Sequence, residues 1–181
     1  MILAPEQRSP TWQSPDDYME AGTAQAGNLP FYYISLGNRP VVLDDVQALI
    51  RFMGQLNQAM PLLLLSNCPG FEPSTEAERQ GLVFYAGQYR SLQQQERETG
   101  RLILSYAHQI VVGGTYLMHG LSANVKALAP DTRFHDSIPS RPPVPIPQVV
   151  ARGLADAIVS PADFPNWLEA QLHVSPSGTQ P

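Results

Sequence analysis

Residues 75–129, which read TEAERQGLVFYAGQYRSLQQQERETGRLILSYAHQIVVGGTYLMHGLSANVKALA, are the longest periodic stretch of the sequence and decide which fold it predicts. Thr75 and Glu78 have the spacing of a capping box, in which each side chain accepts a hydrogen bond from an unpaired backbone N–H at a helix start. The polar run 93–98 interrupts the pattern, which predicts one long helix or two helices that meet near Gly100. Apolar side chains recur at three- and four-residue steps, as on one helix face, at Leu82, Tyr85, Ala86, Tyr89, Leu92, Leu102, Ile103, Tyr106, Ala107, Ile110, Leu117 and Leu121.

Two other interpretations of this stretch remain open. The β-branched run 109–112, the pair Gly113-Gly114 and residues 115–118 also fit a two-residue β-hairpin. Residues 102–125 carry no formal charge and are long enough to cross a bilayer. Polar side chains at His108 and His119 are costly in hydrocarbon, so a helix buried in protein is the preferred interpretation.

A second helix is predicted over 44–60. Asp44 and Gln47 form an Asp-x-x-Gln capping box, and Pro61 ends the pattern. Leu62-Leu63-Leu64-Leu65 follows as a buried strand or a link through the core. The predicted fold is therefore mainly α, with helices near 44–60 and 75–129, a small β-hairpin option at residues 31–43, and extended Pro-rich arms. One apolar face of the second helix is formed by Val46, Leu49, Ile50, Met53, Leu56 and Met60.

The distribution of proline predicts four parts. Residues 1–30 form an extended N-terminal arm, 31–130 a helical core domain, 131–147 a Pro-rich strap, and 148–181 short helices and a tail. Large apolar side chains on the arm, the helices and the C-terminal segment are candidates for contacts with partner proteins. These candidate partner-binding residues are Trp12, Tyr18, Tyr85, Tyr89, Val149, Leu154 and Trp167.

The composition of the chain excludes several classes of function. The formal net charge is -5, and Lys126 is the sole lysine, so a phosphate-binding nucleic-acid surface is not predicted. Cys68 is the single cysteine, which excludes a disulfide framework and a Cys-based zinc site. The N-terminus lacks the basic and apolar regions of a signal peptide, so cytoplasmic synthesis is expected, with later incorporation into a virion or other large complex as an option.

The sequence predicts no catalytic, cofactor-binding or metal-binding residues. His108 and His119 would lie about 16 Å apart on one helix at 1.5 Å per residue, too far to share a metal. Cys68 could be a nucleophile, but a loop cysteine beside proline is better explained as a small side chain. Gly113-Gly114 lacks the pattern of a phosphate-binding loop.

These features predict a non-enzymatic structural or connector subunit of a large assembly, such as a virion neck or tail component or part of a secretion apparatus. It would form homo- or hetero-oligomers by docking its arms on neighbouring subunits. One alternative is a soluble adaptor or chaperone-like binder that holds a partner helix along the face from Leu82 to Leu121. Another is a membrane-associated subunit inserted through 102–125, and a small enzyme around Cys68 ranks last.

Overall fold

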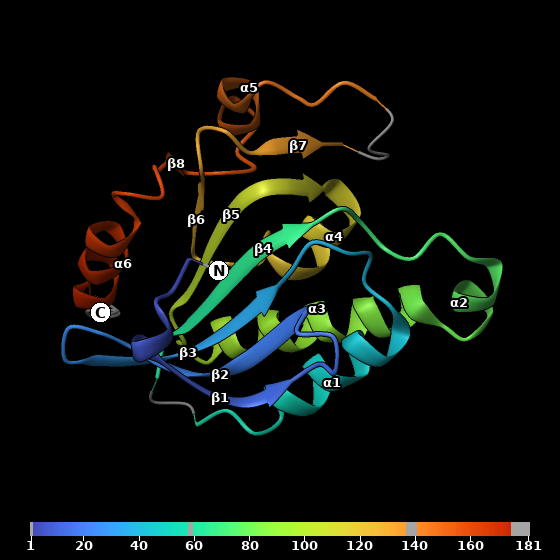
Figure 1. Ribbon diagram of the computed structural model, residues 1–181, viewed down its shortest axis with the longest axis horizontal. Helices are drawn as coiled ribbons and strands as arrows, with labels where there is room; N and C mark the ends of the chain where they lie inside the picture. The colour runs from blue at the N-terminus through green and yellow to red at the C-terminus, as the bar shows by residue number, and fades with distance from the viewer. Residues whose placement is uncertain (1, 58–59, 137–140, 175–181) are drawn as a thin grey trace.

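A mixed β-sheet of eight strands forms the centre of the computed structural model, which describes residues 2–57, 60–136 and 141–174 (Figure 1). The strand order is β1-β2-β3-β4-β5-β6-β8, and β7 pairs with the second half of β5. Neighbours are antiparallel from β1 to β3 and parallel from β3 to β8. The strands are β1 Arg8–Gln13, β2 Met19–Ala26, β3 Leu29–Leu36, β4 Leu62–Cys68, β5 Ile103–Val112, β6 Val125–Leu128, β7 Arg133–His135 and β8 Ala157–Ile158.

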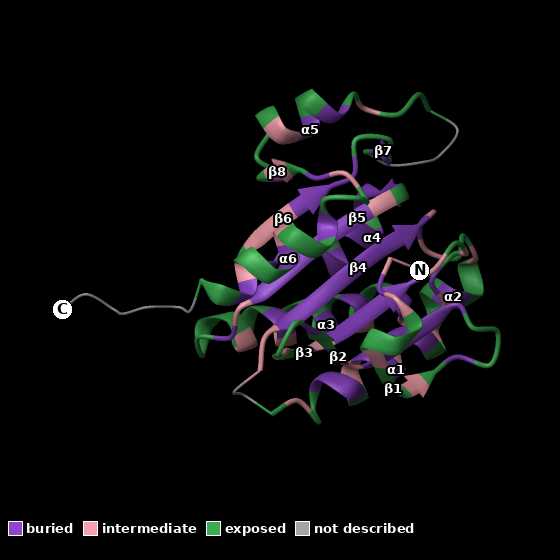
Figure 2. Ribbon diagram, turned by 60° about the vertical axis from the view of Figure 1, so that its left-hand side comes forward, coloured by how far each residue is buried: buried purple, intermediate pink, exposed green. Residues whose placement is uncertain are grey.

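Helices cover both faces of this sheet. In β4, Leu62 and Leu64 pack with α1 and α3 on one face, whereas Leu63 and Leu65 pack with α6 on the other. Every residue of β4 is buried, as Figure 2 shows for the central strands, and continuous burial is typical of parallel strands between helix layers. The helices are the 3₁₀ turn η1 Pro5–Gln7, α1 Leu43–Met53, α2 Thr75–Arg79, α3 Leu82–Glu98, α4 Gly113–His119, α5 Ile146–Ala151 and α6 Phe164–His173.

The mainly α prediction is wrong, because the chain is an α/β protein built on this sheet. The predicted helix over 44–60 is α1, which ends earlier, at Met53. The predicted helical stretch 75–129 contains three helices and two strands of the sheet. Its first helix, α2, is capped one residue before the predicted cap Thr75, since the Ser74 hydroxyl accepts the Ala77 N–H at 3.0 Å.

The segment 102–125 forms strand β5, helix α4 and the turn that leads to β6. The β-branched run 109–112 is therefore strand, as the hairpin interpretation required, but Gly113 begins a helix and not a return strand. Within the described part of the chain, no helix combines the length and apolar character needed to cross a membrane.

The N-terminal segment predicted as an extended arm is extended, but it lies in the sheet as β1 and β2. Pro10 is placed in β1, an edge strand, beside a register irregularity between Pro10 and Trp12. Residues 31–36 belong to β3, whose hairpin partner is β2 and not residues 41–43. Part of the predicted strap, 137–140, and the end of the predicted tail, 175–181, lie outside the described residues.

Candidate active site

The carboxyl ends of three parallel strands meet at one edge of the sheet. β3 ends at Leu36, β4 at Cys68 and β5 at Val112. In open α/β sheets, ligands bind outside the carboxyl ends of the strands. The segments that follow β4 and β5 at this edge are therefore candidates for a ligand-binding site. They are residues 69–71 and 113–114.

The segment after β4 is fixed by a short pairing with Val41. The Val41 N–H donates to the Gly70 carbonyl and the Glu72 N–H donates to the Val41 carbonyl, both at 2.9 Å. This parallel bridge leaves the N–H of Phe71 directed away from Val41. Gly70 has φ +129°, a conformation that side chains with a Cβ rarely adopt, so the turn requires glycine here.

The segment after β5 is the first turn of α4. The N–H groups of a helix's first turn have no partner within the helix, and Gly113 and Gly114 begin α4. A Cβ on Gly113 would overlap the backbone carbonyl of Asp136, which makes glycine necessary at this position too. The Thr115 hydroxyl donates to the Val112 carbonyl at 2.9 Å and holds the turn.

The two segments lie side by side. A Cβ built on Gly114 would lie 3.5 Å from the Phe71 ring, and one built on Gly70 would lie 3.8 Å from the Val112 side chain. In acyl chemistry an oxyanion can be stabilised by backbone N–H groups that converge from two neighbouring segments. We call these residues, Gly70, Phe71, Gly113 and Gly114, the amide pair of segments.

Cys68 lies beneath this edge and is not exposed to it. Its Sγ is 3.3 Å from the Tyr18 hydroxyl, 3.4 Å from the Arg39 carbonyl and 3.3 Å from the Gly70 carbonyl. Burial raises the pKa of the Cys68 thiol, so the neutral, weakly nucleophilic form is favoured. These contacts give Cys68 a packing role that supports the Gly70 turn.

The two histidines singled out from the sequence lie in different environments. His119 is fully buried, its Nδ1 is 3.0 Å from the Tyr89 hydroxyl, and burial lowers its pKa to about 4. His108 is half-buried, stacks on Tyr106, and lines a pocket of about 210 Å³ with Asp131. Burial also lowers the pKa of His108.

The candidate partner-binding residues are divided between the interior and the surface. Tyr18, Tyr89 and Val149 are buried within the chain itself. Four others keep part of their surface accessible, namely Trp12, Tyr85, Leu154 and Trp167. Contact of these residues with a partner stays a prediction.

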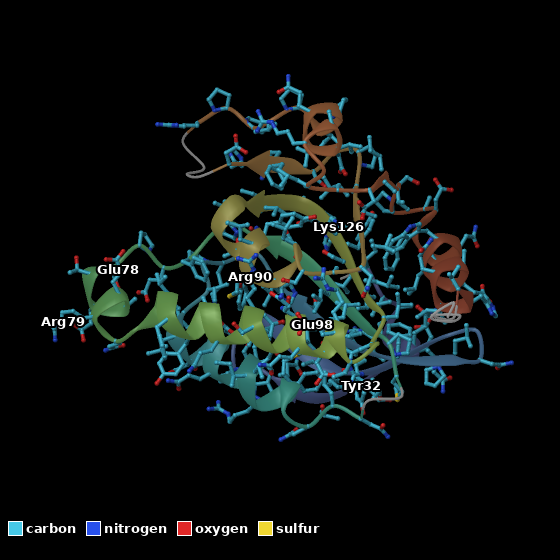
Figure 3. All side chains as sticks on the ribbon, turned by 180° about the vertical axis from the view of Figure 1, so that it is seen from behind. Tyr32, Glu78, Arg79, Arg90, Glu98 and Lys126 are labelled. Carbon is cyan, nitrogen blue, oxygen red and sulfur yellow. The ribbon has the colours of Figure 1, made fainter. Side chains whose placement is uncertain are left out.

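A groove that sequence reasoning missed runs between α1 and α3. It has a volume of about 690 Å³ and includes Val83 and Phe84, whose exposed fractions are 66% and 65%. Figure 3 shows Arg90 and Glu98 on α3, the helix that forms most of the groove. The sequence pattern had placed the buried face of this helix correctly at Leu82, Ala86 and Tyr89, but gave no sign that the opposite face is apolar near its start. The groove is lined by Ile50, Val83, Phe84, Gly87, Gln88, Ser91, Leu92 and Gln95.

This architecture is similar to that of chains in several solved decarboxylase and carboxylase structures. The Pseudomonas malonate decarboxylase MdcD-MdcE hetero-dimer contains a similar chain, with a TM-score of 0.79 and 14% identity, and the match covers 92% of this chain and 83% of that one. Transcarboxylase 12S, a hexamer solved with methylmalonyl-coenzyme A and methylmalonic acid bound, has a TM-score of 0.74 and 16% identity, covering 91% and 38%. The β subunit of P. aeruginosa geranyl-CoA carboxylase gives 0.70 and 20%, covering 88% and 41%.

At these identities the similarity establishes the fold, and the chain spans less than half the length of the transcarboxylase and carboxylase chains. No family model and no curated protein sequence matches the chain.

The shared fold overturns the functional interpretation drawn from the sequence. The non-enzymatic connector subunit of a virion or secretion apparatus is wrong, as are the adaptor and membrane-inserted alternatives, because this fold is shared with carboxyltransferase and decarboxylase enzymes. Of the proline-rich segments that motivated a connector, the N-terminal one contains strands β1 and β2 of the sheet, and the described part of the strap contains β7.

Proposed function

We propose that this chain is a subunit of an enzyme that decarboxylates, or transfers the carboxyl group of, an acyl-CoA thioester. Two observations support the proposal. The fold is shared with malonate decarboxylase and acyl-CoA carboxylase subunits, and the amide pair of segments lies where parallel strands end. The observation that carries it is the forced glycine on each side of the site, at Gly70 and Gly113, because it keeps two backbone N–H segments next to each other.

The chemistry needs such a site. When a thioester that carries a carboxylate on its α-carbon loses carbon dioxide, the bond between the α-carbon and the carboxylate breaks. The electron pair moves onto the thioester oxygen as an enolate, and the α-carbon then takes a proton. In carboxyl transfer, the carboxylated thioester gives its carboxyl group to an acceptor and becomes this enolate, or the enolate takes a carboxyl group from a donor. Backbone N–H groups of Phe71 and Gly114 would donate to the enolate oxygen, and one such donor contributes roughly 10²–10³ in rate in other enzymes.

A second subunit would complete the enzyme. The relatives are described as a hetero-dimer and a hexamer, and this chain spans only 38% of the transcarboxylase length. Val83 and Phe84 follow closely on the segment that carries Gly70 and Phe71, and they are apolar and exposed. We therefore propose that a partner subunit of the same enzyme covers the α3 groove, since exposed apolar patches of this kind mark interfaces.

Titration of the chain with acetyl-CoA tests the proposal, with backbone amide signals followed by NMR. We expect the largest shifts at Gly70, Phe71, Gly113 and Gly114, and smaller ones with coenzyme A, which lacks the thioester carbonyl. Gly87→Ala is the matched control, because a Cβ at Gly87 meets no atom within 4 Å and the residue lies outside the amide pair. Shifts confined to other regions, or equal shifts with both ligands, would contradict the proposal.

A further inference from the structure

The strand β5 contains an irregularity immediately before the amide pair of segments. Residues 62–66 of β4 lie opposite residues 103–107 of β5, but Cys68 lies opposite Val111. One β4 residue, Asn67, therefore faces three β5 residues, His108, Gln109 and Ile110. β5 also changes partner across this point, from β6 before it to β7 after it.

The Asn67 side chain bonds to two of these three β5 residues, Gln109 and Ile110. Its Nδ2 donates to Gln109 Oε1 at 2.8 Å, and its Oδ1 accepts the Ile110 N–H at 3.3 Å. Gln109 has φ +62°, a left-handed conformation that is uncommon for residues other than glycine. Asn67 itself is buried, so its bond to the Ile110 N–H is shielded from water, whereas the bond to the exposed Gln109 side chain is partly accessible.

The alternation of side chains between the two faces of the sheet does not prevent β5 from slipping relative to β4. A slip of one residue turns every side chain to the opposite face of the sheet, but the offset here is two residues, which leaves each side chain on its own face. A slipped register, with Cys68 opposite Gln109, would move the start of α4 by roughly 7 Å along β4. Gly113 and Gly114 would then no longer lie beside Gly70 and Phe71.

We infer that Asn67 is a positioning residue: its side chain holds β5 in the register that places Gly113 and Gly114 beside Gly70 and Phe71. It acts through the strand and touches no reacting group. The inference rests on the proposed function for its catalytic meaning, but the register itself can be measured without any ligand.

The first test is Asn67→Ala in the full chain, which removes both side-chain bonds. NMR is used to measure the contacts between strands β4 and β5. We expect the Cys68–Val111 contacts to weaken and Cys68–Gln109 contacts to appear. Asn67→Asp keeps the acceptor for the Ile110 N–H, and the exposed Gln109 amide can turn to donate, so native contacts should return. Ile103→Val in the first half of β5 is the control, because it should lower Tm by a comparable few degrees and leave the register unchanged.

Retention of the native contacts in Asn67→Ala, with a Tm loss like that of Ile103→Val, would overturn the inference. If Asn67→Ala does not fold, Gln109→Ala provides the second test, since it removes one of the two bonds. Hydrogen exchange at Ile110, Val111 and Val112 should then accelerate at least threefold relative to Ile103→Val, and unchanged exchange would refute a positioning role.

Acetyl-CoA titration separates this inference from the proposed function. If the wild-type chain binds, Asn67→Ala should bind at least tenfold more weakly and Asn67→Asp within about threefold of wild type. If the wild-type chain shows no response, the proposed function fails, and the contacts between Cys68 and β5 still decide the role of Asn67.

Discussion

The hydroxyl of Tyr89 on α3 lies 3.0 Å from Nδ1 of His119 on α4, and both side chains are fully buried. Burial lowers the pKa of His119 to about 4 and raises the pKa of Tyr89, so both groups are neutral at pH 7. The pair joins α4, whose first residues are Gly113 and Gly114, to α3, which lines the exposed groove.

Acid should destabilise the chain through His119. Its pKa is about 4 in the folded chain and 6.5 ordinarily, so the unfolded state binds a proton more readily. The contribution of the neutral ring to the free energy of unfolding is complete above pH 6.5 and falls as the pH drops towards 4. It amounts to about 3 kcal/mol in total. Urea unfolding between pH 7 and 4 should show this loss, and His119→Phe should show a smaller pH dependence. Equal pH dependence in both chains would refute this role for His119.

Two glycine substitutions should have opposite effects. Gly113→Ala places a Cβ against the Asp136 carbonyl and should destabilise the chain by about 2 kcal/mol or more, since the backbone must move. Gly87→Ala lies in open space on α3 and should stabilise the free chain by roughly 0.5–1 kcal/mol. Chemical denaturation measures both, and similar effects at the two positions would contradict the geometry around Gly113.

Phe84 should matter for association and not for folding. Its side chain is 65% exposed, so Phe84→Asp should change the free energy of unfolding by less than about 0.5 kcal/mol. The same substitution should lower self-association or capture of a partner subunit, because it places a charge on the apolar groove. Sedimentation of the wild-type and variant chains provides the measurement, with Arg51→Asp on exposed α1 surface as a charge control. Unchanged association in Phe84→Asp would remove the groove from consideration as an interface.

Cys68 should behave as an inert thiol in the folded chain. Burial and the raised pKa both oppose thiolate formation. A thiol reagent at pH 8 should label the native chain at least tenfold more slowly than the urea-unfolded chain. Faster labelling of the native chain would instead indicate an activated nucleophile.

The sequence predicted the elements whose pattern is unambiguous. The amphipathic period of α1 and of the buried face of α3 and the continuous leucines of β4 all have direct structural counterparts. β5 was misassigned because it is buried on both faces, so Ile103, Tyr106 and Ala107 need not alternate with polar residues and happen to match a helical period.

The candidate site left little trace in the sequence because its donors belong to the backbone. The visible signals were Gly70 after a proline and Gly113-Gly114 after a β-branched run, and both glycines are explained only by contacts with residues distant in sequence, such as Val41 and Asp136. Asn67 gave no signal at all, since its partner Gln109 is 42 residues away.

The margins of the sheet restrict how copies of this chain can join one another. Pro10 in β1 lacks the amide hydrogen that an incoming strand would need, and β8 at the opposite margin is two residues long. Neither edge of the sheet is a good template for adding strands, so edge-to-edge assembly of copies into fibres is disfavoured. Association of copies through the helices that cover the sheet is therefore favoured over the addition of strands.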